Sequence, residues 1–254
     1  MLLALTRPVP ASIGDCELTH LDRRPIDMAR AVAQHASYLT ALEAPGCTIE
    51  ELPRLDQMPD SVFVEDTAVV LDEIAILTRP GAISRRGETA TVAKALALHR
   101  TIVTIEAPAR LDGGDVLTVG RQIYVGQSGR SNAAGFEQLR SAVARFGYRV
   151  DPVPLAGCLH LKSAATLVAP DTVLINPAWV EAGAFGALET MAVDPGEPFA
   201  SNALLVGSRV LYPAAFTKTA ARMEKRGITL RVLQAGELGK AEGGLTCCSI
   251  LLRI

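Results

Sequence analysis

Residues 63–80 read FVEDTAVVLDEIAILTRP and contain two short apolar runs, which the polar pair Asp72 and Glu73 separates. Runs of this length that are rich in valine and isoleucine are typical of buried strands. The first run, in which small or polar residues precede a β-branched segment, recurs roughly every 40–50 residues, as expected for repeated structural units. The five copies are FVEDTAVVL from Phe63, LDGGDVLTVG from Leu111, HLKSAATLV from His160, ASNALLVG from Ala200 and GGLTCCSILL from Gly243.

Four of these runs are followed by a second apolar strand, namely EIAILTRPG, RQIYVGQSG, DTVLINPAW and SRVLYPAAF. The fifth run is followed by the end of the chain at Ile254, but residues 3–8, LALTRP, resemble ILTRP at residues 76–80. We therefore expect the N-terminal strand to complete the last unit and to close a ring. Closure protects sheet edges, which otherwise promote aggregation.

Helices are predicted between the strand pairs, where apolar residues recur at helical spacing. The predicted ranges are 26–43, 88–99, 132–146 and 216–226. Asp22 or Asp27 is expected to cap the first helix, and Gly147 and Gly227 follow the last two, as glycine often does at a helix C-terminus. Because no Gly/Ser-rich linker divides the chain, we predict a single α/β domain over residues 1–254.

The composition argues against several classes of function. Hydrophobic residues make up 49% of the 254 residues, and the formal net charge is −2. No basic face of the kind that binds nucleic acid is recognisable, the apolar run in MLLALTRPVP is too short for a signal peptide, and no segment reaches the roughly 18 apolar residues of a membrane helix. We expect a cytoplasmic protein that binds a small molecule, with neither a nucleic-acid nor a membrane partner. The oligomeric state stays open, and a homodimer is one arrangement.

The cysteines are Cys16, Cys47, Cys158, Cys247 and Cys248. Their odd number and irregular spacing argue against a disulfide framework, and without a CxxC pair a structural zinc site is not expected. Cys247 and Cys248 are adjacent, and adjacent side chains on a strand point to opposite faces. We therefore expect only one of the two to face a given site.

The starts of the repeated strands carry residue types that a hydrophobic core does not favour, because buried charge is costly unless it is paired. They are Asp60, Glu65, Asp66, Asp112, Asp115, His160, Lys162, Asn202 and Cys247. If the five units form a ring, these positions converge on one central cavity.

A thiol and an imidazole are the reactive groups of this set. Cys247 follows two glycines, which permit close approach of the backbone to a ligand. Its thiol, with an ordinary pKa of about 8.5, needs activation, which a bound guanidinium cation would supply. His160 is the one histidine that leads a repeated strand, and it is a candidate general acid and base. The alternatives are that both cysteines are small core residues and that His160 is structural.

Acids and arginines supply candidate binding groups. A guanidinium pairs well with carboxylates, so Asp60, Glu65 and Asp66 suit a cationic substrate, and one acid could orient His160. For Asp115, which follows two glycines, turn formation is an equally good explanation. Arg85 and Arg130 are expected in loops, where two guanidinium groups could clamp a carboxylate. The alternative is that both are solvated surface residues.

Eight strings, in order along nearly the whole chain, resemble the dimethylarginine dimethylaminohydrolases of the guanidine-modifying (pentein) superfamily. They are CELTHLDR at 16–23, PDSVFVEDTAVV at 59–70, RPGAISRRGE at 79–88, LDGGDVL at 111–117, GRSN at 129–132, HLKS at 160–163, SNALLV at 201–206 and LTCCSILL at 245–252. The resemblance implies a five-fold pseudosymmetric α/β propeller, which agrees with the five repeats.

The resemblance also implies a role for individual residues. Cys247 matches the nucleophile, His160 the general acid and base, and Asp112 the acid that orients the histidine. The substrate-binding residues that it implies are Asp66 and Glu65 for the guanidinium, Asp60 and the backbone of Leu18 for the α-amino group, and Arg85 and Arg130 for the α-carboxylate. The segment around Leu18 resembles a lid, and no metal or organic cofactor is implied.

The implied reaction is covalent. The Cys247 thiolate attacks the guanidinium carbon, His160 protonates the departing alkylamine, and water then releases citrulline from a thiouronium intermediate. The substrates that the resemblance implies are asymmetric dimethylarginine and monomethylarginine, which give dimethylamine or methylamine.

Three alternatives remain open on the sequence alone. The first is an arginine deiminase-like guanidine hydrolase, although such enzymes are typically longer. The second is a non-catalytic ring of the same fold that serves as an interaction module. The third is a thiol metal site made of Cys247, Cys248 and His160, which the divergence of adjacent strand residues disfavours.

Overall fold

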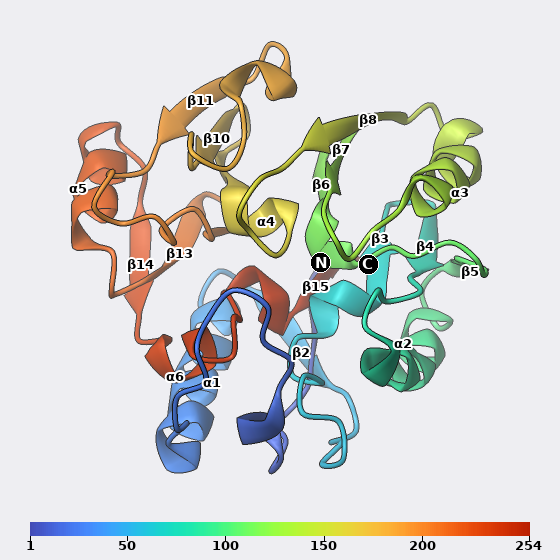
Figure 1. Ribbon diagram of the computed structural model, residues 1–254, viewed down its shortest axis with the longest axis horizontal. Helices are drawn as coiled ribbons and strands as arrows, with labels where there is room; N and C mark the ends of the chain where they lie inside the picture. Colours follow the sequence, from blue (N-terminus) through green and yellow to red (C-terminus); the bar gives the residue numbers. More distant parts are fainter.

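The computed structural model describes residues 1–254 and groups the strands into five sheets of three strands each. In every sheet a first strand runs antiparallel to a middle strand, and the middle strand runs parallel to a third. The same pairing pattern in all five sheets establishes the repeat that the sequence predicts. Figure 1 shows the five units arranged around a common centre.

The first strands are β3 (Ala68–Val70), β6 (Val116–Val119), β9 (Ala165–Ala169), β12 (Leu204–Val206) and β15 (Ile250–Arg253). The middle strands are β4 (Ile74–Leu77), β7 (Gln122–Gln127), β10 (Thr172–Ile175), β13 (Arg209–Pro213) and β1 (Leu2–Thr6). The third strands are β5 (Thr101–Thr104), β8 (Arg149–Pro154), β11 (Glu189–Ala192), β14 (Leu230–Leu233) and β2 (Cys47–Glu51).

The first and middle strands match the predicted pairs, whereas the sequence analysis did not identify the third strands. These third strands are more polar, and several of their residues face solvent, as the sequence TIVT of β5 illustrates. A short strand exposed at a sheet edge lacks the continuous apolar run on which the prediction depends.

The N-terminal strand lies in the same sheet as the C-terminal strand. β1 is antiparallel to β15, with Leu3 opposite Leu252, and it is parallel to β2. The two chain ends meet there, because the amino group of Met1 donates to the carbonyl of Ile254 over 2.8 Å. The two terminal strands are therefore neighbours in one three-stranded sheet, in the order β15-β1-β2.

The helices connect middle strands to third strands, and four of the five connections follow the prediction. They are α1 (Met28–Glu43), α2 (Thr89–Leu96), which follows a 3-10 helix at Ile83–Glu88, α3 (Ala133–Ala144) and α5 (Thr217–Lys225). Asp27 caps α1 by accepting from the backbone of Arg30, and Gly147 and Gly227 adopt the left-handed conformation predicted for them. The unit of β10 has a 3-10 helix, Ala182–Phe185, instead of an α-helix.

No helix combines the length and the hydropathy that a membrane crossing requires.

Four of the five predicted strand starts are helical turns and not strand, whereas the segment before β12, which contains Asn202, has no helix. Asp66 lies in a 3-10 helix at Val64–Thr67, Asp112 precedes another at Gly113–Asp115, and His160 precedes α4 (Leu161–Ala164). Cys247 lies in a 3-10 helix at Thr246–Cys248, so the two adjacent cysteines are not on a strand. Each turn ends where a first strand begins, and single turns carry no period-two or helical pattern that a sequence can reveal.

The five first strands surround the centre of the ring. A cavity of about 260 Å³ is lined by residues of all five, among them Val69, Leu117, Leu167, Leu205 and Leu251. The turns that precede these strands therefore meet at one end of the ring, where the functional residues collect.

Candidate active site

Cys247 lies on a turn that several polar contacts fix in place. The Asn202 side chain donates to Thr246 Oγ1 over 3.0 Å and accepts from the Thr246 backbone over 3.1 Å. At Gly243 and Gly244, any Cβ atom would collide with the ring of Phe63 and the side chain of Asn202, respectively. The two glycines therefore let the Cys247 turn pack directly against neighbouring units.

The two adjacent cysteines diverge, as expected, although they do so on a turn. The Cys248 side chain is fully buried among apolar residues, and its thiol approaches the Gly244 carbonyl at 3.5 Å. Cys247 is half-buried, and it lines two cavities that His160 also lines. Because Cys248 lies in the core, the alternative metal site made of both cysteines and His160 is wrong.

Asp112 holds the imidazole of His160. The distance from His160 Nε2 to Asp112 Oδ2 is 3.0 Å, and both side chains are buried. The other carboxylate oxygen of Asp112 accepts from the Gly81 backbone over 2.7 Å. Two different repeats thus fix the orientation of the ring, and the imidazole Nδ1 faces Asp66 Oδ1 at 3.9 Å.

The electrostatic surroundings favour a protonated His160. Burial alone would lower the pKa of His160, but Asp66, Asp112 and Asp115 together raise it to about 9. Burial likewise opposes ionisation of Asp66, yet His160 and Arg85 lower its pKa to about 2. At neutral pH, the site therefore contains an imidazolium that can donate a proton and an ionised Asp66.

Cys247 differs, because its surroundings favour the neutral thiol. Burial raises the pKa of Cys247 to about 12, and the negative charges of Glu65 and Asp66 act in the same direction. A positive group beside the sulfur would reverse this effect and favour the thiolate. The electrostatics therefore suit a nucleophile that a cationic substrate activates.

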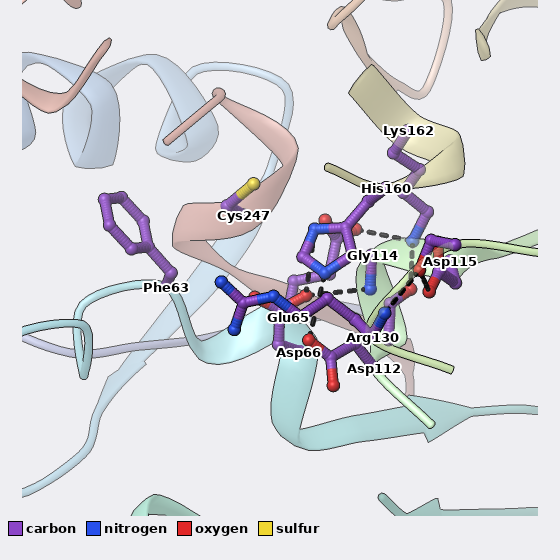
Figure 2. Close-up of polar contacts among 12 residues, drawn as sticks. Phe63, Glu65, Asp66, Asp112, Gly114, Asp115, Arg130, His160, Lys162 and Cys247 are labelled. Atoms are coloured by element: carbon purple, nitrogen blue, oxygen red, sulfur yellow. Dashed lines mark hydrogen bonds and ion pairs between the residues drawn. The ribbon is translucent and has the colours of Figure 1, made fainter. Parts of the chain in front are cut away.

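Figure 2 shows how side chains from separate units meet at this site. Asp115 accepts from the hydroxyls of Ser128 and Ser131 over 2.5 and 2.6 Å, and from the backbone of Leu161 over 3.0 Å. It thereby fixes the start of α4 directly after His160. Burial raises the pKa of Asp115 to about 6 against the opposing effect of His160. From the sequence, Asp115 was equally well explained by turn formation and by a functional role. In the structure it lies behind His160, where it holds the backbone that follows this residue.

Glu65 forms a second, partly buried polar pair with Lys162. The Lys162 ammonium donates to Glu65 over 2.6 Å, and the Thr246 hydroxyl donates to the other Glu65 oxygen over 2.7 Å. Glu65 lines the central cavity between the first strands and neither of the cavities that contain Cys247. Both carboxylate oxygens of Glu65 thus accept hydrogen bonds from the protein itself. The resemblance, in contrast, implies that Glu65 contacts the substrate directly.

A small cavity brings together most of the remaining predicted residues. Asp60, Asp66, Arg85, Arg130 and Glu17 line it beside His160 and Cys247. The carboxylate of Asp60 accepts from the Glu17 backbone over 3.1 Å, which brings the loop that contains Leu18 next to this cavity. Acidic and basic groups therefore face one another across a space that adjoins the thiol.

Arg85 is not a solvated loop residue, because its side chain is only 6% exposed. Its guanidinium donates to Asp66 over 2.5 Å, to both oxygens of Glu88, and to the backbone carbonyls of Asp60 and Phe63. Arg130 is more accessible and donates to the Thr19 hydroxyl over 3.1 Å. The two arginines face the same cavity, but Arg85 is anchored and Arg130 has more freedom.

Glu242 is a residue that the sequence analysis missed. It lies just before Gly243, lines both cavities and has φ of 57°, a left-handed conformation that is uncommon outside glycine. Its carboxylate bonds to the loop that contains Leu18. No local signal in the sequence reveals such a contact, because its partners are more than two hundred residues away.

Comparison with known proteins identifies the family. The protein-family model described as "N,N dimethylarginine dimethylhydrolase, eukaryotic" matches residues 20–177 of the sequence. The chain is 41% identical to the N(G),N(G)-dimethylarginine dimethylaminohydrolase of Streptomyces coelicolor over 98% of this chain and 96% of the relative. It is 33% identical to the protein of that name from Pseudomonas aeruginosa over 96% of each.

Solved structures agree with this assignment. The structure of a cysteine-to-serine variant of the P. aeruginosa enzyme in complex with citrulline has a TM-score of 0.93, 31% identity and 98% coverage of both chains. The N-terminal domain of a cyanobacterial arginine dihydrolase shares the fold at a TM-score of 0.89 and 18% identity. By sequence and by fold, the chain belongs to the N(G),N(G)-dimethylarginine dimethylaminohydrolase family.

Proposed function

We propose that this protein hydrolyses free Nω-methylated arginines, namely asymmetric dimethylarginine and monomethylarginine, to citrulline and dimethylamine or methylamine. The observation that carries the proposal is the meeting of Cys247 with the His160–Asp112 pair beside a cavity lined by opposite charges. Two relatives with the name of this activity are 41% and 33% identical to the chain, and a solved relative contains citrulline, the product.

The amino-acid end of the substrate binds at the small cavity, which has a volume of about 20 Å³ in this structure and has to widen to admit it. Asp60 and the backbone carbonyl of Leu18 would accept from the α-ammonium group. Arg130, together with the anchored Arg85, would hold the α-carboxylate, since guanidinium groups pair well with carboxylates. This assignment is supported by the presence of Asp60, Arg85 and Arg130 around the same cavity.

The guanidinium end lies between Asp66 and Cys247. The ionised Asp66 attracts the cation directly, and Glu65 contributes negative charge from behind, where it already bonds to Lys162. Burial and the negative charges of Glu65 and Asp66 raise the pKa of Cys247 to about 12, and the positive charge of the bound guanidinium lowers it again. The thiol therefore loses its proton when substrate binds.

The first half of the reaction forms an S–C bond and breaks a C–N bond. The Cys247 thiolate attacks the guanidinium carbon, and the protonated His160 gives its proton to the departing amine. A thiouronium intermediate on Cys247 remains, and His160 is left neutral.

The second half restores the enzyme. Neutral His160 takes a proton from water, the hydroxide adds to the same carbon, and the S–C bond breaks. Citrulline leaves, and the thiol is regenerated. Every group that this route uses is a side chain of the protein, so no cofactor is needed.

We expect Cys247→Ser to abolish citrulline formation, with a loss on the order of 10³-fold or more, since the covalent step needs the sulfur. Cys248→Ser should retain most of the activity, because that side chain lies in the core. The measurement is citrulline release from dimethylarginine, with free arginine as the alternative substrate. The matching check is an adduct on Cys247 in the intact-protein mass after trapping with substrate. Loss of activity with Cys248→Ser alone would place the nucleophile one residue later, and faster turnover of free arginine would favour a deiminase.

Asp112→Asn should lower kcat on the order of 10²-fold, since it weakens general acid catalysis by His160. The pH profile gives the sharper readout. The pKa of His160 is raised to about 9 by Asp66, Asp112 and Asp115 against the effect of burial, so the proton needed for leaving-group departure is lost as pH rises through about 9. In the variant, the fall of kcat/KM at high pH should begin at a lower pH. Asp112→Glu should restore part of the raised pKa of His160. If kcat/KM of Asp112→Asn falls at the same high pH as in the native protein, Asp112 does not raise the pKa of His160.

We also infer that residues 1–254 form one catalytic domain and that pairing of β1 with β15 closes the ring. The two chain ends exchange two backbone hydrogen bonds, of 2.8 and 2.9 Å, which supports closure. All five cysteines are free, as is usual in reducing compartments, which supports a cytoplasmic location and a part in arginine metabolism there.

Ring closure is tested by moving the first strand. Removal of residues 1–10 should prevent folding, because it leaves β15 and β2 without the strand between them. A permuted chain of residues 11–254, a short glycine-rich linker and residues 1–10 should refold, with a Tm within about 10 °C of the native chain, a shift of a few kcal/mol at most. The measurement is thermal unfolding followed by circular dichroism. Native-like unfolding of the shortened chain would show that β1 is dispensable.

A further inference from the structure

Two cavities of different character meet at the thiol and the imidazole. The small one, described above, is bounded by charged side chains. The second, which we call the annex, has a volume of about 370 Å³. The residues common to both are Leu159, His160, Glu242, Gly243 and Cys247. The reacting carbon of a substrate therefore has a polar compartment on one side and the annex on the other.

The part of the annex that lies away from the thiol is largely apolar. Trp179 and Phe199 meet edge to face with their ring centroids 5.2 Å apart, and Phe216 and Cys158 complete this wall. Phe199 is 48% exposed, so the annex also opens to solvent. An apolar, aromatic-lined compartment of this volume is in the range that binds drug-sized molecules, far larger than two methyl groups.

The direction of the substrate follows from the charges. The amino-acid end carries an ammonium and a carboxylate, and the small cavity contains the groups that complement both. The nitrogen that leaves the guanidinium carbon then points toward the annex. Lys162 and Glu242 also line the annex, but Lys162 donates to Glu65 and Glu242 accepts from the loop that contains Leu18. The aromatic rings of the far wall favour an apolar group.

We propose that the annex is a leaving-group subsite that accepts guanidines with large apolar N-substituents, arylalkyl groups in particular. This inference rests on the proposed function. With an Nω-benzyl arginine, Cys247 forms its S–C bond as the C–N bond to benzylamine breaks, and His160 supplies the proton to that nitrogen. Water then adds, so the products are citrulline and benzylammonium.

The test compares Nω-benzyl arginine with asymmetric dimethylarginine on the same preparation. We expect kcat/KM for the benzyl substrate to lie within tenfold of that for dimethylarginine. Ala215→Phe, at an exposed position that lines the annex, should lower the benzyl-to-dimethyl ratio of kcat/KM at least tenfold. Ala90→Phe, at an exposed position on α2, is the matched control and should leave the ratio unchanged.

The outcomes separate the two proposals. Turnover of dimethylarginine with a hundredfold lower kcat/KM for the benzyl substrate overturns the annex assignment alone. An unchanged ratio in Ala215→Phe has the same consequence. Absence of turnover with both substrates overturns the proposed function and the annex assignment together.

A separate observation concerns Glu242. One carboxylate oxygen of Glu242 accepts from three successive backbone N–H groups, those of Thr19, His20 and Leu21, over 3.0, 2.5 and 2.6 Å. The other oxygen is buried without a hydrogen-bond partner. A hydrogen bond to an ionised carboxylate is stronger than one to a neutral acceptor. A single side chain next to the nucleophile turn thus bonds to three successive backbone groups of a segment more than two hundred residues away.

The segment in question covers both cavities. Glu17 lines the small cavity, and His20 and Leu21 line the annex. Within the segment, Arg23 donates to the carbonyls of Gly14 and Cys16, so the loop is tied into a compact unit. Glu242 is the point at which this unit joins the Gly243–Gly244 turn that precedes Cys247.

We infer that Glu242 is a positioning residue that holds the 14–24 loop over the site. Its effect is on substrate binding and loop order, since neither the thiol nor the imidazole bonds to it. Glu242→Ala should raise KM for dimethylarginine at least fivefold and leave kcat within about threefold. Trypsin should cleave the Arg23–Arg24 bond at least tenfold faster than in the native protein, whereas Pro25 protects the bond after Arg24.

Two further variants make this result specific. Glu242→Gln should restore slow cleavage and low KM in large part, because its amide oxygen still accepts hydrogen bonds. Glu224→Ala, on the exposed face of α5, should match the native protein in both measurements. Unchanged cleavage of the Arg23–Arg24 bond overturns the inference, as does a loss that falls on kcat with KM unchanged.

Discussion

The structure depends on a buried cluster of charges in which Asp66 and Asp112 pair with His160 and Arg85. Asp66 lies between His160 and Arg85, and Asp112 bonds to the same imidazole. Isolated charges at such depth would cost several kcal/mol each. The four short segments that carry these groups therefore need one another, and the ring of sheets is the scaffold that keeps them at bonding distance.

This charge cluster also gives the ring two different ends. The Glu65–Lys162 pair lies where the preceding turns meet, with the central apolar cavity on one side and the thiol on the other. The apolar first strands close the far side through packing. Polar residues are thus confined to one end, where each repeat contributes one turn, and no repeat contains a complete site by itself.

The repeats, ten of the fifteen strands and four helices follow from the sequence, because apolar runs and helical spacing are local signals. The gathering of Cys247, His160 and Asp112 followed from the repeat and from the resemblance. Three features did not follow. The third strands are too polar to stand out, the turns before the first strands are too short to show a period, and the Glu242 contact joins distant segments. Arg85 was expected in a loop, either as part of a carboxylate clamp or as a solvated residue. Its burial could not be predicted, because it depends on Glu88 and Asp66, which the fold brings beside it.

The electrostatics of the thiol and the imidazole favour selective chemistry over general reactivity. The same carboxylates that raise the pKa of His160 to about 9 add to the effect of burial that raises the pKa of Cys247 to about 12. A thiolate forms readily only when a cation compensates those negative charges, so a neutral electrophile meets a thiol rather than a thiolate. In the proposed reaction, the acids therefore do more than bind the guanidinium, because they make formation of the thiolate depend on substrate binding.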